Sequence, residues 1–311
     1  MKILLTGKNG QVGWELERSL QPLGQVIAFD RTGLDLANPD SIRAAIREIK
    51  PDLIVNAAAY TAVDKAESEP ELAMAINGIA PGVMAEEAKR LGAAIVHYST
   101  DYVFDGTKTE PYTEDDVPNP INVYGKTKLA GEQAIQAVGV PHLIFRTSWV
   151  YGVRGKNFMR TILRLAKERD ELRIVDDQLG APTWCRMIAE TTAQALAQHP
   201  SLRAHSSLFR GGELAGVYHL TAGGQATWYR FAKAILENAA SRIPADFGLD
   251  RRSHVLPQLT PITTDEYPLP AKRPVNSLLS NRRLNTQFGL TLQDWSMSLM
   301  LCVDEMYLDP A

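Results

Sequence analysis

A tyrosine and a lysine four residues apart form the first pair in this sequence that could do chemistry. Tyr124 and Lys128 would share one face of a helix. The lysine ammonium could then lower the pKa of the phenol and let the tyrosine act as an acid or a base near neutral pH. A second such pair, Tyr229 and Lys233, lies among residues typical of helix packing, and we interpret it as structural.

Hydroxyl and small side chains follow two apolar runs upstream of this pair. Residues 98–104 read Tyr-Ser-Thr-Asp-Tyr-Val-Phe, and residues 56–60 read Asn-Ala-Ala-Ala-Tyr. If both runs are parallel strands, their carboxyl ends line a ligand crevice, where alanines admit a cofactor and hydroxyls reach the reacting centre. Alone, residues 99–101 would be a turn with a local side-chain cap. The nearby tyrosine–lysine pair favours the chemical interpretation.

A glycine-rich loop joins the first apolar run to a helical pattern. Gly7, Gly10 and Gly13 recur at every third position. Glycines here allow a tight turn and close approach of the backbone to a pyrophosphate, while the helix N-terminus directs N–H groups at the phosphates. The loop predicts a dinucleotide site, against the alternative of a loop that is glycine-rich without a ligand.

Charged residues at the end of the next apolar run could select the cofactor. Asp30 could accept hydrogen bonds from an adenosine ribose, which favours NAD. Arg31 and Lys8 could pair with a 2'-phosphate, which favours NADP, although Arg31 could instead be a solvated charge at a strand end. These residues leave both NADPH and NADH open, and dual use is compatible with them.

The elements that must position these residues alternate along the first half of the chain. Apolar runs predict strands at Lys2–Thr6, Gln25–Asp30, Asp52–Ala57, Ala93–Ser99 and His142–Thr147. Helical patterns run over Gln11–Leu20, from the cap residues Asn38–Ser41 to Ile49, and over Pro70–Leu91. This alternation implies parallel strands joined by right-handed crossovers. The predicted fold is α/β, with a doubly wound, Rossmann-type dinucleotide-binding domain at residues 1–148.

Residues 149–311 are predicted to form mainly a smaller substrate-binding domain, with some segments returning to the first sheet. Its helical patterns cover Asn157–Lys167, Arg186–Ala197, Thr227–Ala239 and Leu292–Met306, and its strand patterns cover Arg173–Asp176 and Val217–Thr221. Pro257–Pro274 contains five prolines and reads as an irregular loop. The stretch Ala204–Gly216 fits no pattern.

Composition excludes several classes of protein. The chain has 311 residues, 45% hydrophobic and 22% charged, but no apolar run long enough to cross a membrane and no recognisable signal peptide, so we expect a cytoplasmic protein. A net charge of −3, with scattered basic residues, argues against nucleic-acid binding. Cys185 and Cys302 form no disulfide framework or metal site, and no histidine spacing fits zinc; His97 reads as a packed side chain. The residues assign no metal.

Taken together, these motifs resemble the extended short-chain dehydrogenase/reductase family that acts on nucleotide sugars, and most closely its dTDP-4-dehydrorhamnose reductase group. The segments that carry the closer resemblance are Gly10–Leu16, Thr61–Pro70, Asn122–Glu132, Arg146–Tyr151 and Asp177–Thr183. Towards the C-terminus the likeness thins to Tyr218–Gly224 and Arg273-Pro274.

The resemblance implies a role for each residue of the site. Tyr124 would donate a proton, Lys128 would lower its pKa and anchor the cofactor ribose, and Thr100 would be the second hydroxyl on the substrate carbonyl. Asp101 and Trp149 would contact the sugar nucleotide, although Trp149 could equally be a core aromatic. Motifs and resemblance together predict a cofactor-binding set made of Gly7, Gly10, Gln11, Val12, Gly13, Asp30, Arg31, Ala57, Ala58, Ala59, Tyr60, Tyr98, Tyr124 and Lys128.

The resemblance also implies an activity, which is hydride transfer from NADPH or NADH to C4 of dTDP-4-dehydro-L-rhamnose in the last step of dTDP-rhamnose biosynthesis. Alternatives are another nucleotide-sugar ketoreductase or epimerase, because the substrate pocket sets the function, and a non-catalytic regulatory subunit that senses a dinucleotide. The family implies a homodimer with Mg²⁺ at a subunit contact, for which only Glu15 stands at a matching place.

Overall fold

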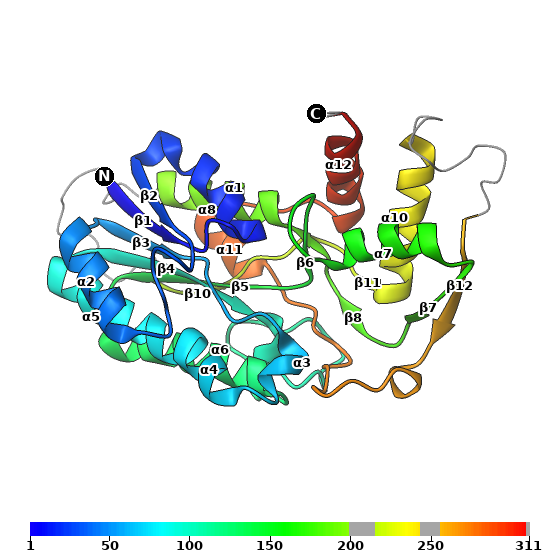
Figure 1. Ribbon diagram of the computed structural model, residues 1–311, viewed down its shortest axis with the longest axis horizontal. Coiled ribbons are helices and arrows are strands. Elements are labelled where there is room, and N and C mark those ends of the chain that lie inside the picture. Colours follow the sequence, from blue (N-terminus) through cyan, green and yellow to red (C-terminus); the bar gives the residue numbers. More distant parts are fainter. Residues whose placement is uncertain (199–214, 243–255, 309–311) are drawn as a thin grey trace.

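The computed structural model describes residues 1–198, 215–242 and 256–308. At its centre lies a six-stranded sheet in the order β2–β1–β3–β4–β5–β10, in which every pair of neighbours runs parallel (Figure 1). The strands are β1 (Lys2–Thr6), β2 (Gln25–Phe29), β3 (Leu53–Asn56), β4 (Ala94–Thr100), β5 (His142–Thr147) and β10 (Gly216–His219). The predicted parallel sheet is confirmed.

Helices cover both faces of this sheet (Figure 1). One face carries α1 (Gln11–Ser19), α8 (Cys185–Ala197) and α11 (Arg282–Phe288), and the other carries α2 (Pro39–Ile49), α5 (Ala80–Leu91) and α6 (Val123–Val138). Ile3 and Leu5 face the first group and Leu4 faces the second, because successive strand side chains point to opposite faces. Burial on both faces explains why the strands read as continuous apolar runs.

The order of the strands fixes where a ligand can bind. The chain adds β2 on one side of β1, with the short helix η1 (Gln21–Leu23) before it, and adds β3, β4 and β5 on the other side. Connections that leave β1 and β3 therefore run to opposite faces of the sheet. They open a crevice at the carboxyl ends of the strands, which is where open α/β sheets bind ligands.

The helix predicted at Pro70–Leu91 contains a widened turn. It is built from α4 (Pro70–Met74), the π-helical turn η2 (Ala75–Ile79) and α5, and it follows the short α3 (Val63–Ala66). Pro81 has no N–H to give to the carbonyl of Asn77, four residues earlier. A Cβ on Gly131 of α6 would lie only 2.1 Å from that carbonyl oxygen. The turn therefore widens where α6 packs closest.

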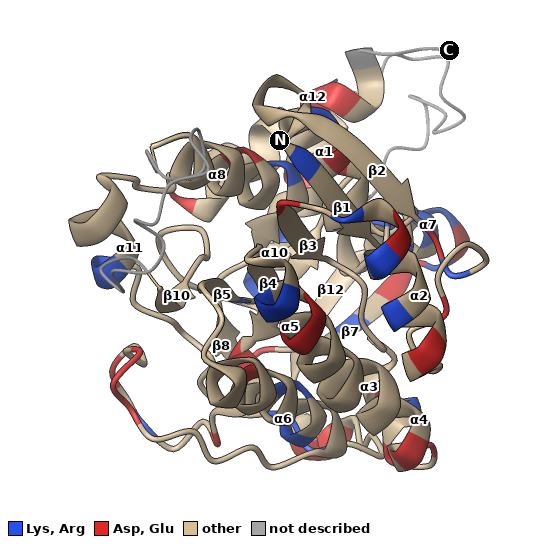
Figure 2. Ribbon diagram, turned by 90° about the vertical axis from the view of Figure 1, so that its left-hand side faces the viewer, with Lys and Arg blue, Asp and Glu red and all other residues tan. Residues whose placement is uncertain are grey.

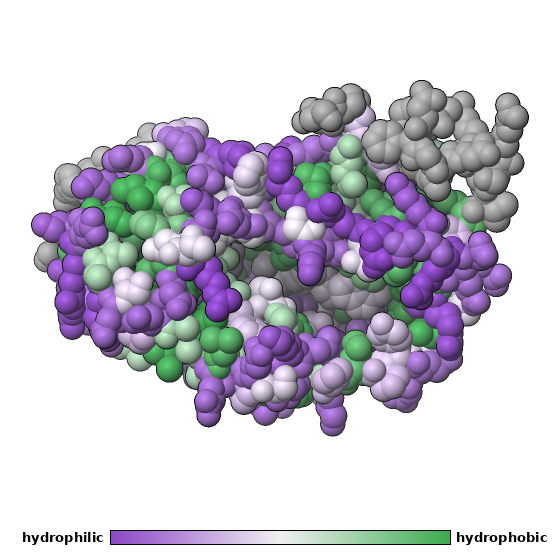
Figure 3. Space-filling model, in the orientation of Figure 1, coloured by the Kyte–Doolittle hydropathy of each residue, from purple (hydrophilic) through white to green (hydrophobic). Residues whose placement is uncertain are grey.

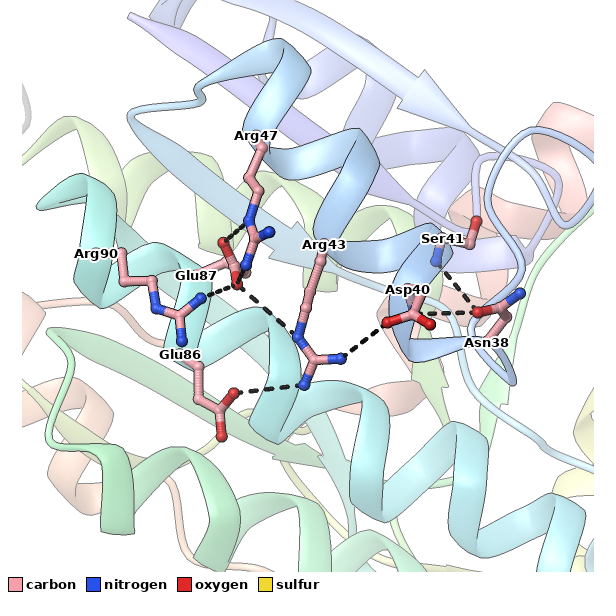
Figure 4. Close-up of polar contacts among 8 residues, drawn as sticks. All are labelled: Asn38, Asp40, Ser41, Arg43, Arg47, Glu86, Glu87 and Arg90. Carbon is pink, nitrogen blue, oxygen red and sulfur yellow. Dashed lines mark hydrogen bonds and ion pairs between the residues drawn. The ribbon is translucent and has the colours of Figure 1, made fainter.

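A charge cluster joins α2 to α5 (Figure 4). Glu87, whose side chain is 2% exposed, accepts hydrogen bonds from Arg47 at 2.7 and 2.8 Å and from Arg90 at 2.6 Å. Arg43 lies 3.9 Å from the same carboxylate. The Arg47 guanidinium, above all, holds the pKa of Glu87 below its ordinary value. Acidic and basic residues are mixed over the helices of this side (Figure 2).

A second lobe lies beside the carboxyl ends of the strands (Figure 1). Its elements are α7 (Phe158–Glu168), α10 (Trp228–Arg242) and α12 (Trp295–Leu308), with three small sheets that pair β7 (Glu171–Val175) with β12 (Gln258–Ile262), β6 (Val150–Tyr151) with β9 (Thr183–Trp184), and β8 (Leu179–Gly180) with β11 (Ala226–Thr227). Tyr151, Met159, Phe231 and Leu299 are among its core residues. Segments after residue 148, including β10, α8 and α11, pack with the first sheet.

The prediction of an irregular loop over Pro257–Pro274 is wrong in its first part. Residues 258–262 form β12, parallel to β7, and residues 264–266 form the short helix η5 (Thr264–Glu266). Among the described residues β12 pairs with β7 alone, so proline is tolerated there because no second ladder needs the missing N–H. Residues 204–214 of the unassigned stretch lie outside the described residues.

No helix in the described ranges is both long and apolar enough to cross a membrane.

Candidate active site

The glycine loop packs its backbone too tightly for side chains. Gly7 has φ +77°, and a Cβ there would lie 2.8 Å from the amide nitrogen of Ala58. A Cβ on Gly13 would lie 2.0 Å from the carbonyl oxygen of Gly7. The loop thus presses against the alanine turn after β3 and leads into the N-terminus of α1, whose cap residue Gly10 makes no side-chain bond. This cradle fits a dinucleotide pyrophosphate.

Gln11 and Val12, which lie between Gly10 and Gly13, face the second lobe rather than the loop. Gln11 donates a hydrogen bond to the carbonyl of Val150 at 3.4 Å and accepts one from Asn157 at 2.8 Å. Val12 packs against the cores of both lobes. The glycine loop is therefore anchored to the second lobe at the start of α1.

Asp30 is occupied by its own turn. Its Oδ1 accepts hydrogen bonds from the Thr32 amide at 3.0 Å, the Thr32 hydroxyl at 2.6 Å and the Gly33 amide at 3.1 Å. Its Oδ2 accepts a hydrogen bond from Asn9 at 3.3 Å and lies 3.9 Å from Lys8 Nζ. The Thr32 hydrogen bond, first among these contacts, lowers the pKa of Asp30 to about 2. A ribose would have to compete for this carboxylate.

Arg31, by contrast, is exposed beside this turn.

The alanine turn after β3 is braced against α6 through Asn77. Asn77, from the widened turn, accepts the backbone N–H of Tyr60 at 2.8 Å and donates to the Tyr60 carbonyl at 3.1 Å and to Thr127 of α6 at 3.2 Å. The Tyr60 hydroxyl donates to Glu69 at 2.7 Å. Ala57, Ala58 and Ala59 are partly buried and carry no bulky side chains.

Thr100 and Asp101 end β4 and begin the short helix η3 (Asp101–Val103). The Thr100 hydroxyl caps this turn by accepting the Tyr102 amide at 3.1 Å, and it donates to Asp101 Oδ1 at 2.9 Å. The local cap considered from the sequence is therefore present. Asp101 is 3% exposed with no partner for Oδ2, and burial raises the pKa of its carboxyl to about 7.

Tyr124 stands in the first turn of α6, next to Thr100. Asn122 caps this helix by accepting the Gly125 amide at 2.8 Å. The phenol hydrogen-bonds with Thr100, while burial and the Asp101 carboxyl raise the pKa of Tyr124 to about 12. This shift is opposite to the lowering that the sequence predicted. The cause is desolvation, and a phenol with a raised pKa keeps its proton at neutral pH, as an acid must.

Lys128 lies one turn further along α6, with 2% of its surface exposed. Its Nζ donates to the carbonyl of Tyr98 at 2.5 Å and lies 3.3 Å from His97 Nε2. Burial lowers the pKa of Lys128 to about 8. His97, interpreted as a packed side chain, is fully buried, but its contact with Lys128 was not predicted.

Two predicted contact residues point elsewhere. The Tyr98 hydroxyl hydrogen-bonds with Thr192 of α8 at 2.8 Å, so only its backbone carbonyl meets the site. Trp149, with φ +45°, stacks on Trp228 of the second lobe at 3.5 Å between ring centroids, and a Cβ on Gly180 would lie 2.3 Å from its ring. Its indole is held between these neighbours.

A segment after β12 returns across the carboxyl ends of the strands. Arg273 forms a two-pronged ion pair with Asp64 of α3, at 2.6 and 2.7 Å, and a hydrogen bond with Tyr102. Ser277, whose hydroxyl donates to the Leu179 carbonyl at 3.2 Å, lies beside Asp101. No role was predicted for these contacts, although the resemblance had included Arg273-Pro274. The space-filling view shows a recess between the two lobes (Figure 3).

The residues at the position expected for magnesium do not fit that ion. Glu15 of α1 is paired with Arg186 of α8 at 3.2 Å, and Arg186 also pairs with Glu305 of α12 at 2.5 Å. A guanidinium thus already neutralises the carboxylate. Among the described residues, no group of three or more acidic, histidine or cysteine side chains could hold a metal.

The second tyrosine–lysine pair, Tyr229 and Lys233, lies on α10 in the second lobe. Lys233 is exposed and its Nζ lies 3.9 Å from Glu237.

Comparisons with known sequences identify the family of this chain. The family model described as RmlD substrate binding domain matches residues 1–308. A protein of Burkholderia thailandensis named dTDP-4-dehydrorhamnose reductase is 51% identical over 306 residues, covering 98% of this chain and 99% of that protein.

Two solved structures carry the same name. A dTDP-4-dehydrorhamnose reductase from Clostridium acetobutylicum has a TM-score of 0.86 at 39% identity, covering 98% of this chain and 99% of that one. Another, from Bacillus anthracis and in complex with NADP, has a TM-score of 0.85 at 34% identity with the same coverage.

Proposed function

The chain belongs to the RmlD substrate binding domain family, and on that premise we propose that it reduces dTDP-4-dehydro-L-rhamnose to dTDP-L-rhamnose with NADPH or NADH. One observation carries the proposal: the Tyr124 and Thr100 hydroxyls meet at the carboxyl end of β4, one helical turn from the buried Lys128. Residues 1–148 supply the dinucleotide site, and residues 149–311 supply mainly the substrate site.

The reaction divides between cofactor and protein. The nicotinamide, when bound, supplies a hydride to C4 of the keto sugar. Tyr124, which holds its proton at neutral pH, donates that proton to the developing alkoxide. Thr100 stabilises the same oxygen with its hydroxyl. Lys128 binds the cofactor ribose and adds positive charge to the site.

Thr100 has to change its hydrogen bond to do this. In the structure its hydroxyl donates to Asp101. On substrate binding it turns to the sugar oxygen, and a sugar hydroxyl takes its place on the Asp101 carboxyl, which otherwise has an unpartnered buried oxygen. Asp101 thereby contacts the sugar nucleotide, as the resemblance implied. Trp149, stacked on Trp228, supports the wall of this pocket.

The charged residues around Asp30 favour NADPH over NADH in a protein that uses both cofactors. Asp30 is engaged by its turn, whereas Arg31 is exposed and Lys8 meets Asp30 only at 3.9 Å. Both cations are available to a 2'-phosphate. The relative from Bacillus anthracis was solved with NADP.

Compartment and assembly belong to the same proposal. We expect a cytoplasmic homodimer. Both cysteines are free and buried, which agrees with a reducing compartment. Magnesium has no part in the proposal.

The experiment is a panel of dTDP-, GDP- and UDP-linked 4-keto sugars incubated with NADPH and with NADH, with the product sugar identified by NMR. We expect consumption of one cofactor per dTDP-sugar and a product with the rhamno configuration. A talo product, or good turnover of only a GDP- or UDP-linked sugar, would contradict the proposal. An epimerase would consume no cofactor, and a dinucleotide-sensing subunit would turn over nothing.

A further inference from the structure

A row of buried polar side chains crosses the sheet behind Lys128. Thr6, Asn56 and His97 are paired in register on β1, β3 and β4, and their exposed fractions are 2%, 1% and 0%. The Thr6 hydroxyl lies 2.7 Å from Asn56 Oδ1, and Asn56 Nδ2 lies 3.1 Å from His97 Nδ1. The row ends at Lys128, 3.3 Å from His97 Nε2.

The lysine has few other acceptors. The carboxylate nearest to it along α6, Glu132, is already bound by Arg146 of β5 at 2.7, 3.0 and 3.2 Å and by the Ser99 hydroxyl. Within the described part of the chain, Lys128 Nζ contacts two acceptors, the Tyr98 carbonyl and the His97 imidazole. Since a buried ammonium needs hydrogen-bond acceptors, the imidazole lone pair is one of only two contacts that can support the charge.

The contact between His97 and the Lys128 ammonium determines which imidazole tautomer is required. His97 is neutral, because burial and the Lys128 charge both hold its pKa well below the ordinary value. If Nε2 accepts from the ammonium, Nδ1 carries the proton and must donate to an oxygen. In the structure Asn56 Nδ2 faces His97 and Asn56 Oδ1 accepts the Thr6 hydroxyl. The tautomer therefore requires the Asn56 amide to be turned over, so that Oδ1 faces His97 and Nδ2 donates to Thr6, whose hydroxyl oxygen also accepts the Ala58 amide at 3.3 Å. The opposite tautomer would turn an N–H towards the ammonium.

We propose that His97, held in the Nδ1–H tautomer by Asn56 and Thr6, is a positioning residue that keeps Lys128 charged and aimed for cofactor binding. The inference rests on the proposed role of Lys128. Two of the three ammonium protons are used by Tyr98 and His97, so one remains for a ligand. Without the imidazole, the ammonium loses an acceptor in a desolvated site and gives up its proton at lower pH.

The test compares three variants with the wild type. His97→Leu keeps the volume of the side chain close to that of histidine but removes the acceptor, while His97→Gln keeps an acceptor at the end of the side chain. His219→Leu is the matched control, because His219 is also 0% exposed but lies on β10 against Phe104. Thermal melts verify folding in each variant.

Two readouts report on the lysine. The first is the ¹³Cε chemical shift of Lys128, followed against pH in the protein without ligand and assigned with a Lys128→Arg variant. The second is NADPH binding, followed by fluorescence between pH 6 and pH 9. In His97→Leu we expect the pKa of Lys128 to fall by about one unit, so that NADPH binding weakens roughly tenfold at pH 9 and hardly at pH 6. His97→Gln should restore most of the loss.

An unchanged lysine titration in a folded His97→Leu protein would overturn the inference, as would equal shifts in His97→Leu and His219→Leu. If the wild type bound NADPH but reduced no keto sugar, the proposed function would fail. The lysine titration would still decide the role of His97, because it needs no turnover.

Discussion

At the scale of single residues, the proposed mechanism depends most on Tyr124 as the proton donor. Tyr124→Phe removes the hydroxyl but almost no volume. We expect kcat to fall roughly 100-fold or more, because the variant has no hydroxyl at this position to protonate the developing alkoxide. Steady-state kinetics measure the loss, while circular dichroism and NADPH fluorescence should show an unchanged fold and binding.

Tyr229→Phe is the control for this change. Tyr229 belongs to the second tyrosine–lysine pair, on α10 of the second lobe, and its loss should leave turnover almost unchanged. Near-normal activity in Tyr124→Phe would remove the tyrosine from the mechanism.

Arg31 should decide how strongly the enzyme prefers NADPH. Arg31→Ala removes an exposed cation next to the occupied Asp30 carboxylate. NADPH binding should weaken roughly tenfold or more through loss of a charge-assisted contact to the 2'-phosphate, while NADH binding stays nearly constant. Dissociation constants for the two cofactors measure the difference. Equal losses for both would mean that Arg31 supports the turn.

Residue types and their context predicted which residues come together in the candidate site, but not its electrostatics. Tyr124 and Thr100 meet at the carboxyl end of β4, as their places after a predicted strand and at a predicted helix start indicated. The pKa of Tyr124 was predicted with the wrong sign, because desolvation depends on neighbours that the tyrosine–lysine spacing does not reveal. The contact between His97 and Lys128 was missed because the two residues are remote along the chain and meet only in the folded protein.

At the scale of elements, the contact between α2 and α5 depends on one buried carboxylate. Glu87→Gln leaves Arg47 and Arg90 without their shared anion. We expect the melting temperature to fall by about 3 °C at pH 7. Glu86→Gln is the matched control, since Glu86 is 48% exposed and meets Arg43 only at 3.7 Å, so it should change little.

The pH dependence of this effect has a definite sign. The pKa of Glu87 is lower in the folded protein than its ordinary value of 4.5. Its stabilisation is therefore complete above pH 4.5 and is lost as the pH falls through the lower, folded-state pKa. Calorimetry of wild type and Glu87→Gln should give melting temperatures that converge in acid. A gap that widened in acid would contradict the assignment.

Local periodicity predicted the elements whose partners are regular. The central strands and their crossover helices were recognisable because the inner strands, such as β3 and β4, are buried on both faces. Strand β12 was missed because it contains Pro261, and prolines are common in loops. Its partner among the described strands, β7, also lies far back in the chain. The widened turn at η2 was missed because it depends on the approach of Gly131 from α6.

At the scale of the whole molecule, the two lobes are tied together over the site. Arg273 follows β12 of the second lobe. Both terminal nitrogens of its guanidinium bind Asp64 of α3, and it also contacts Tyr102. The backbone amide of Ala271 donates to the same carboxylate at 3.2 Å. This latch holds the segment with Ser277 against Asp101, so it should fix the substrate pocket rather than the glycine loop.

A double-mutant cycle tests this latch. Arg273→Met and Asp64→Asn should each lower kcat/KM for the keto sugar roughly tenfold, mainly through KM, and the double variant should be no worse than Arg273→Met, because both changes break one interaction. NADPH binding should stay close to that of the wild type. Arg173→Met, which breaks the exposed pair with Glu266 inside the second lobe, should change neither quantity. Losses that multiply to about 100-fold in the double variant would show that the two residues act independently and that the lobes are not held by this pair.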